Sequence, residues 1–179
     1  MGVIFVAGIY GVGKSTLCAR LSKELGVPAY SAGDLISAVN EERYGANKAV
    51  NDKCLNQNIL ALQVNNLLKA TPKILLAGHF CIFDKNNNVD YLPETVFSDL
   101  EITEIILLET SISRIIEILS VRDNKEYTKQ QVSALQSAES QRAQVISLRL
   151  GCKLYLHTMS FDDTDILKCL SYVKTEEKL

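Results

Sequence analysis

The chain has 179 residues, a formal net charge of −2 and a composition that is 47% hydrophobic. This length suits one globular domain with a substantial core, and the composition is ordinary for such proteins. Since binding to long duplex nucleic acid needs clustered Lys and Arg, the charge argues against that partner and leaves room only for a local basic pocket, as a mononucleotide would need.

The five cysteines are widely spaced and form no CxxC pair. Most lie in apolar stretches, which predicts buried, reduced thiols and a cytoplasmic protein. Residues 1–7 contain no basic segment of the kind that opens a secretory leader. No apolar run approaches ~20 residues, so no membrane span is expected.

The first predicted strand, Val3–Ala7, leads into the sequence Gly-Ile-Tyr-Gly-Val-Gly-Lys-Ser-Thr at 8–16. Its spacing is that of a phosphate-binding P-loop, G-x-x-x-x-G-K-S. A helix predicted over 16–25 and ending at Gly26 completes the strand, loop and helix that the motif requires. Lys14 is expected to reach the β- and γ-phosphates of ATP as a catalytic residue, and the Ser15 hydroxyl to bind Mg²⁺. The expected ATP-binding residues are Gly8, Gly11, Val12, Gly13, Lys14, Ser15 and Thr16.

Further along the chain, predicted strands alternate with predicted helices. The strands cover 27–32, 73–77, 102–108 and 153–159, and the helices cover 35–39, 55–68, 111–119, 128–150 and a closing segment that Asp162 or Asp163 could cap. Residues 80–92 indicate a hairpin, and 120–127 a charged loop. The long helix should begin at Thr128, with Gln131 as its capping-box partner. This alternation predicts an α/β fold in which a parallel sheet is covered by helices on both faces.

The P-loop alone is shared by motors, switches, transporters and kinases. A guanine-binding switch would need an N-K-x-D motif, and the nearest match, Asn-Lys-Glu-Tyr at 124–127, lacks the Asp. The signature segment of an ABC-type cassette is also missing from the sequence. A small kinase is therefore the favoured class.

Phosphoryl transfer needs cations that close over the phosphates, and the chain has six arginines. Arg122 falls in the charged loop where a lid, at about 120–128, would lie, and Arg142 in the next helix could point back to the same place. Each could instead be a solvated surface arginine. Arg43 could bind the phosphate of an acceptor. Arg20 is expected to be an exposed partner of a carboxylate.

Two further residues follow predicted strands at the edge of the sheet where α/β proteins bind ligands. Asp34 could hold the waters of Mg²⁺ or the acceptor, or it could cap the next helix. His79 could contact the acceptor or a phosphate, or be a hydrogen-bonded structural imidazole. His157, on the last predicted strand, is expected to be structural.

These residues together resemble the archaeal-type adenylate kinases, of the nucleoside monophosphate kinase superfamily, and in particular bacterial P-loop proteins with D-G-H-F after the third strand. The match runs from the first strand to about residue 159. It rests on Gly-Val-Gly-Lys-Ser-Thr at 11–16, Gly33-Asp34, Gly78-His79, Tyr-Leu-Pro at 91–93, Ile-Leu-Leu-Glu at 106–109, Arg122-Asp123 and Arg142. The resemblance implies a P-loop NTPase three-layer sandwich with five parallel strands, a mobile lid, an acceptor-binding segment at about 33–70 and ATP:AMP phosphotransfer with Mg²⁺. It also allows oligomers.

Two positions depart from the resemblance. The third strand of that family ends in an acidic residue that orients the waters of the metal, and this chain has Ala77 there. Its loss should weaken Mg²⁺ positioning and slow the chemistry. Many adenylate kinases also have an arginine where this chain has Ser37, although the archaeal type does not.

Three functions remain open. The first is a nucleoside monophosphate kinase, with AMP or a related deoxynucleotide as acceptor. The second is a kinase for a hydroxyl acceptor, with Asp34 as the base. The third is a weakly catalytic or non-catalytic ATP-binding module whose nucleotide state orders a lid for a protein partner; Ala77 favours it.

Overall fold

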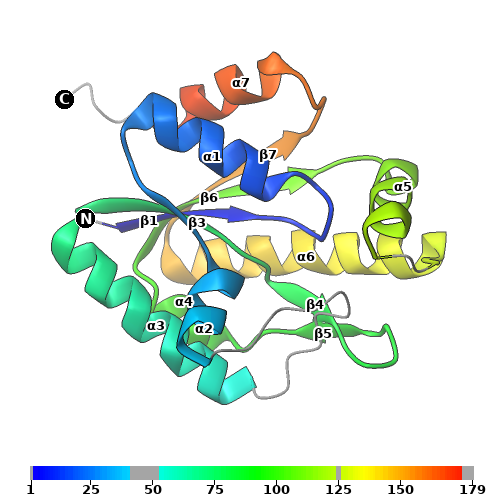
Figure 1. Cartoon of the computed structure of the whole chain (residues 1–179), viewed down its shortest axis with the longest axis horizontal. Helices are drawn as coiled ribbons and strands as arrows, with labels where there is room; N and C mark the ends of the chain where they lie inside the picture. The colour runs from blue at the N-terminus through cyan, green and yellow to red at the C-terminus, as the bar shows by residue number, and fades with distance from the viewer. Residues whose placement is uncertain (1, 41–52, 124–125, 175–179) are drawn as a thin grey trace.

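The structure, a computed structural model, describes residues 2–40, 53–123 and 126–174. Five parallel strands form its main sheet in the order β2-β3-β1-β6-β7, as Figure 1 shows. Their bounds are β1 Gly2–Ala7, β2 Ala29–Ser31, β3 Lys73–Ala77, β6 Ile102–Glu109 and β7 Lys153–Thr158. The predicted five-stranded parallel sheet is thereby confirmed.

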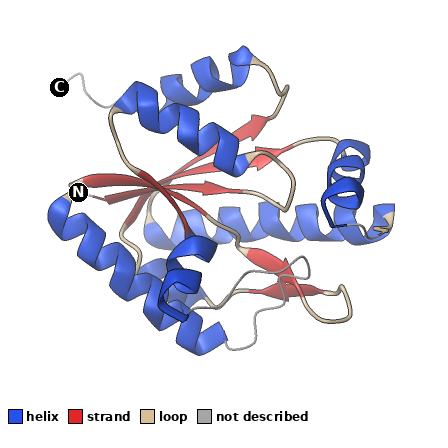
Figure 2. Cartoon of the chain, in the orientation of Figure 1, coloured by secondary structure: helices blue, strands red, loops and turns tan. Residues whose placement is uncertain are grey.

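Helices cover both faces of the sheet and make it the middle of three layers (Figure 2). On one face lie α1, Lys14–Leu25, and α7, Asp163–Lys174; on the other lie α3, Lys53–Ala70, and α6, Lys129–Leu150. The remaining elements are α2 Ala32–Asn40, the antiparallel hairpin β4 Cys81–Phe83 and β5 Val89–Tyr91, α4 Glu94–Ser98 and α5 Ile112–Asp123. The short helix α4 was not predicted.

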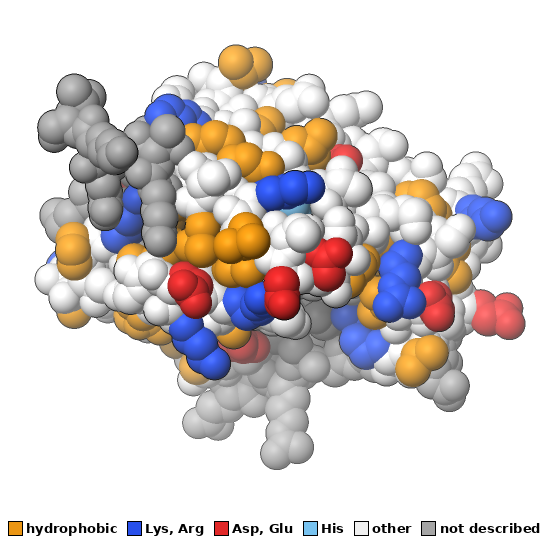
Figure 3. All heavy atoms as spheres, turned by 90° about the horizontal axis from the view of Figure 1, so that it is seen from above, with side chains coloured by type: hydrophobic (Ala, Val, Ile, Leu, Met, Phe, Trp, Pro, Cys, Tyr) orange, Lys and Arg blue, Asp and Glu red, His pale blue; other side chains and the backbone are white. Residues whose placement is uncertain are grey.

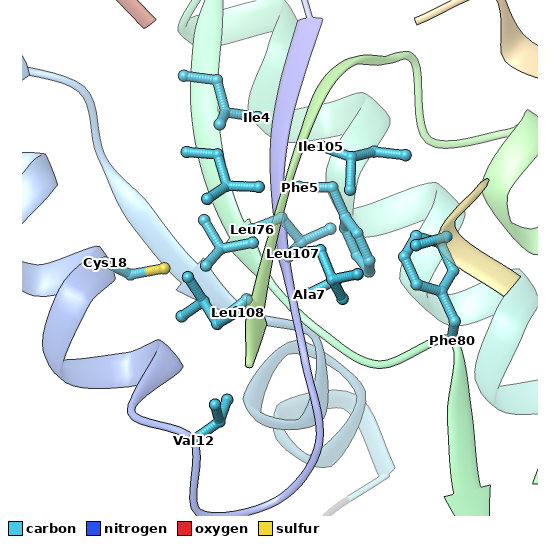
Figure 4. Packing of buried hydrophobic residues seen from close by; sticks show 14 of the residues in the cluster. Ile4, Phe5, Ala7, Val12, Cys18, Leu76, Phe80, Ile105, Leu107 and Leu108 are labelled. Atoms are coloured by element: carbon cyan, nitrogen blue, oxygen red, sulfur yellow. The ribbon is translucent and has the colours of Figure 1, made fainter. Parts of the chain in front are cut away.

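The core forms around β1, the central strand, whose six residues are all buried. A strand with helices on both sides must be apolar throughout, which explains its unbroken run of aliphatic and aromatic residues. Phe5 of β1 packs against Phe80, with ring centroids 5.1 Å apart (Figure 4). The Phe97 ring centroid lies 5.9 Å from that of Phe5. This aromatic cluster ties β1 to the start of the hairpin and to α4.

The capping box predicted for the long helix is present. The Gln131 N–H donates to the Thr128 hydroxyl oxygen at 3.2 Å, and the Thr128 N–H donates to the Gln131 side-chain oxygen at 3.1 Å. The helix ends at Gly151, whose φ of +64° is the left-handed conformation that glycine adopts most easily. The capping residues at Thr128 and Gly151 therefore determine where α6 begins and ends, as predicted.

Two predicted boundaries were wrong, and both bear on site residues. Helix α2 begins at Ala32, so Asp34 lies inside its first turn; the Ser31 hydroxyl accepts the Asp34 N–H at 3.4 Å and takes the capping role suggested for Asp34. Helix α5 continues to Asp123, which places Arg122 in its last turn and not in a loop. Charge was read as a loop signal, yet residues 120–123 contain no helix breaker.

The surface and the thiols agree with the bulk composition. On the face in Figure 3, Lys and Arg side chains are scattered among acidic and apolar ones. Within residues 2–40, 53–123 and 126–174, no helix combines the length and apolarity needed to cross a bilayer. Cys18, Cys81 and Cys169 are buried, Cys152 is half-buried, and all four are free thiols, as expected.

Candidate nucleotide-binding site

The P-loop joins β1 to α1 through a backbone path that requires glycine. Gly8, Gly11 and Gly13 have φ values of +145°, +79° and +98°, where other residues are strained. A Cβ on Gly8 would also lie 2.7 Å from the Leu108 carbonyl oxygen. Gly13 occupies the N-cap of α1 and offers no side chain to its first-turn amides. Such a helix end is suited to an anion.

Lys14 lies against the carbonyl groups of its own loop. Its Nζ donates to the Gly8 carbonyl oxygen at 2.7 Å and to the Ile9 carbonyl oxygen at 2.9 Å. Ser15 and Thr16 follow on the first turn of α1 and are exposed. Lys14, Ser15 and Thr16 all line one cavity. The predicted ATP-binding stretch therefore borders a cavity in the structure.

That cavity has a volume of about 360 Å³ and extends from the P-loop into the interior between the sheet, α2, α3 and α4. Gly33, Asp34, Ala77, Gly78 and His79, which follow or end strands β2 and β3, are part of its lining. The rest of its wall is mostly apolar, with two amides: Phe5, Ile36, Asn56, Gln57, Leu60, Ile82, Leu92, Val96, Phe97 and Leu100. In Figure 1 the hairpin and α5 stand beyond the carboxyl ends of the strands, beside the P-loop.

Arg122, which was predicted as a lid arginine, lines the cavity from the last turn of helix α5. Helix α5 packs so closely on the P-loop that a Cβ on Gly11 would lie 3.2 Å from a Leu119 methyl carbon. The Arg122 Nε and Nη2 donate to the two Asp123 carboxylate oxygens at 2.5 and 2.7 Å. This hydrogen bonding raises the pKa of Arg122, so the guanidinium stays charged. The Tyr127 hydroxyl also donates to Asp123, at 2.7 Å.

Arg142 does not line the cavity. Its guanidinium donates to the Glu94 carboxylate at 2.8 Å and to the Leu92 carbonyl oxygen at 3.1 Å, and its central carbon lies 5.8 Å from the Tyr91 ring centroid. The structure therefore places Arg142 at the end of the hairpin and does not bring it together with Lys14. Arg43, the arginine predicted to bind the phosphate of the acceptor, lies outside the described residues.

The remaining predicted residues fall into two groups. Asp34 and His79 both line the cavity, and the His79 ring lies 4.5 Å from that of Tyr10 in the P-loop. His157 and Arg20 lie elsewhere: buried His157 pairs with Asp165 at 2.8 Å, and Arg20 pairs with Asp163 at 2.7 Å. Both have the structural roles expected of them.

Glu139 was not predicted, although it touches the P-loop. It lies in α6 and is 1% exposed. Its carboxylate accepts the N–H groups of Gly8 at 3.1 Å, Phe80 at 2.9 Å and Cys81 at 2.6 Å. Burial raises the pKa of Glu139 to about 7, while the backbone N–H groups and the Lys14 charge oppose that rise. The available sequence signal was an acidic residue on the apolar face of the helix.

The residues at this site fit ATP and Mg²⁺. The glycine path and the uncapped start of α1 suit phosphate oxygens, and Lys14 and Arg122 supply positive charge. The Ser15 hydroxyl and the Asp34 carboxylate offer oxygen donors of the kind that Mg²⁺ prefers, and Mg²⁺ usually keeps several waters. Ala77 offers none. Among the described residues no group of three or more His, Cys, Asp or Glu forms a separate metal site.

A family model described as an AAA domain matches residues 7–136, which include the P-loop, Asp34, His79 and Arg122. The chain belongs to this AAA domain family. No curated protein matches it. The family match and the P-loop make the chain a nucleotide-binding protein with a kinase-like fold.

Solved structures with the same fold include several kinases. Shikimate kinase from Acinetobacter baumannii, in complex with shikimate, aligns with a TM-score of 0.67 and 11% identity, over 100% of this chain and 96% of that one. A gluconokinase from Sinorhizobium meliloti 1021 aligns with a TM-score of 0.61 and 13% identity, over 95% and 90% of the two chains. At such identities the likeness concerns the fold. The archaeal-type adenylate kinase resemblance is not confirmed by these comparisons.

Proposed function

We propose that this protein is an ATP-dependent phosphotransferase whose acceptor is a nucleoside monophosphate, such as AMP or a deoxynucleotide. The observation that carries the proposal is the single cavity that joins the P-loop to a largely apolar chamber. Donor and acceptor can therefore meet at the P-loop end, while the body of the acceptor occupies the chamber.

The chamber favours a planar, weakly polar acceptor over a sugar acid. Its walls carry aromatic and aliphatic side chains, and α3 adds the amides of Asn56 and Gln57. The Gln57 Nε2 is buried with no hydrogen-bond partner within the described part of the chain. A nucleobase needs apolar walls and a few hydrogen bonds at its edge, whereas a polyhydroxy acid would leave many polar groups unpaired. The acceptors named for the structural neighbours are thus a poorer match.

The charges along the cavity suit transfer at the P-loop end. ATP supplies the transferred γ-phosphoryl group, and Mg²⁺ shields its charge. The cations that line the cavity are Lys14 and Arg122, so negative charge is neutralised where the bond breaks. An acceptor phosphate is already ionised, and it needs no base. Ser15 would hold the metal, and Asp34 its waters.

A hydroxyl acceptor, such as a nucleoside, is the second candidate because Asp34 stands on the cavity wall. A hydroxyl nucleophile needs a base to take its proton, and the Asp34 carboxylate, which lines the same cavity as Lys14, could serve as that base. In that case Asp34→Asn would abolish turnover while ATP binding survived.

A third candidate is a nucleotide-gated binding module with little or no catalysis. Ala77 favours it, because this residue ends β3 at the cavity wall and brings no oxygen to the metal. Restored turnover in Ala77→Asp would indicate a decayed kinase.

A coupled ADP-release assay with nucleoside monophosphates, nucleosides and their deoxy forms tests the proposal. We expect turnover with at least one monophosphate, loss of it in Lys14→Ala, and no loss in Lys23→Ala, an exposed lysine on the same helix. Turnover with nucleosides alone would favour the second candidate. ATP binding without turnover of any acceptor would contradict the kinase proposal and leave the binding module.

A further inference from the structure

We propose that Glu139 is a positioning residue for the nucleotide site, which acts on the P-loop and Lys14 through the backbone of Gly8. This inference rests on the proposed binding of ATP at the P-loop. Glu139 does not line the cavity and is not expected to touch a ligand.

Gly8 is held from both sides. Its N–H donates to the Glu139 carboxylate at 3.1 Å, and its carbonyl oxygen accepts from the Lys14 Nζ at 2.7 Å. Gly8 is the residue at which the chain leaves β1, and its φ of +145° allows no other residue without strain. The carboxylate therefore fixes the point from which the P-loop turns and the carbonyl group against which Lys14 lies.

The same carboxylate fixes the root of the hairpin. It accepts the N–H groups of Phe80 and Cys81, which link β3 to β4. One helical turn further along α6, Arg142 binds the Leu92 carbonyl oxygen, where the hairpin ends. Since Ile82 and Leu92 line the cavity, α6 sets the P-loop and the cavity wall relative to each other.

Charge as well as shape matters at this position. The two carboxylate oxygens accept three backbone donors, Gly8 on one oxygen and Cys81 on the other, with Phe80 within reach of both. A neutral amide has only one acceptor oxygen, so its NH2 group would face the N–H of either Gly8 or Cys81. Above about pH 7, where Glu139 is ionised in the fold, these hydrogen bonds are about twice as strong as those to a neutral acceptor. A shorter carboxylate should therefore hold Gly8 better than an isosteric amide.

The test compares the affinity for Mg-ATP with thermal stability in Glu139→Gln, Glu139→Asp and Glu104→Gln. Glu104 is the matched control, because it is 2% exposed on β6, bonds to Lys73 and does not line the cavity. We expect Glu139→Gln to bind Mg-ATP on the order of 10- to 100-fold more weakly, the size of effect seen when a residue that orients metal ligands is removed. Glu139→Asp should bind more tightly than Glu139→Gln, and Glu104→Gln should match the wild type.

The outcomes separate the proposed function from the positioning role of Glu139. A wild-type chain that binds no ATP would end the proposed function and this inference with it. If the wild type binds Mg-ATP and Glu139→Gln binds it equally well, the positioning role is overturned and Glu139 has only a packing role. The same holds if Glu139→Asp weakens binding more than Glu139→Gln does. If neither variant folds, hydrogen exchange in the wild type decides: the Gly8 amide should be as protected as those of β1, and rapid exchange would overturn the inference.

Discussion

The buried carboxylate of Glu139 predicts a specific dependence of stability on pH. Its ordinary pKa of 4.5 is raised to about 7 in the fold, chiefly by burial. The unfolded chain therefore ionises this group at lower pH than the folded chain does. The stability that the group contributes is complete below about pH 4.5 and is lost as the pH rises through about 7.

The magnitude follows from the two pKa values. Raising this pKa from 4.5 to about 7 makes the ionised fold less stable by an amount on the order of 3 kcal/mol. The Glu139→Gln variant lacks the titration and provides the reference. Its free energy of unfolding should be lower than that of the wild type, because three backbone donors then face an amide. The advantage of the wild type should shrink by about 3 kcal/mol between pH 4.5 and 7.5.

Urea unfolding of both chains across this pH range measures the difference. The chain has no tryptophan, so far-UV circular dichroism is the suitable signal. Other titrating groups are common to both chains and cancel in the comparison. A difference that stays constant with pH, or that grows as the pH rises, would refute the reasoning: the backbone N–H groups and Lys14 would then outweigh burial.

Two further predictions concern the capping box and the thiols. Thr128→Ala removes the hydroxyl that caps α6 and should lower the free energy of unfolding by about 0.5–2 kcal/mol, measured by urea unfolding; an unchanged midpoint would contradict the cap's role. Burial raises the pKa of Cys18, Cys81 and Cys169 to about 12 and also raises that of half-buried Cys152. In the folded protein at pH 8, peptide mapping after alkylation should find Cys152 labelled before the other three, and labelling in the reverse order would count against this burial pattern.

Local patterns in the sequence predicted most of the frame. The P-loop glycines, the hairpin over 80–92 and the capping box at Thr128 each depend on neighbouring residues, so a single stretch of sequence contains the signal. The third strand, with identical bounds at 73–77, was marked by its apolar run and by Pro72 before it. These local structures form independently of how distant parts of the chain are arranged, so the sequence alone can predict them.

The missed features depend on contacts between distant residues. Glu139 is 131 positions from Gly8. No residue near Glu139 in the sequence indicates which backbone N–H groups will donate hydrogen bonds to its carboxylate. Arg142 was expected at the phosphates because it follows the lid, but Glu94 on the unpredicted helix α4 binds it instead. The extra turn of α5 at Arg122 was missed because the charged residues at its end were taken as a loop signal, although none of them breaks a helix.

The contact between Gly8 and Glu139 also bears on synthesis of the chain. The ribosome makes the P-loop well before α6, because the carboxylate that holds Gly8 follows 131 residues later. Its flanking strand β1 likewise pairs with β6, whose residues lie about 100 positions away. The glycine turn can therefore be fixed only after α6 has been made, and the slow closing of such long loops adds to the delay. Nucleotide affinity should thus arise only after α6 has been synthesised.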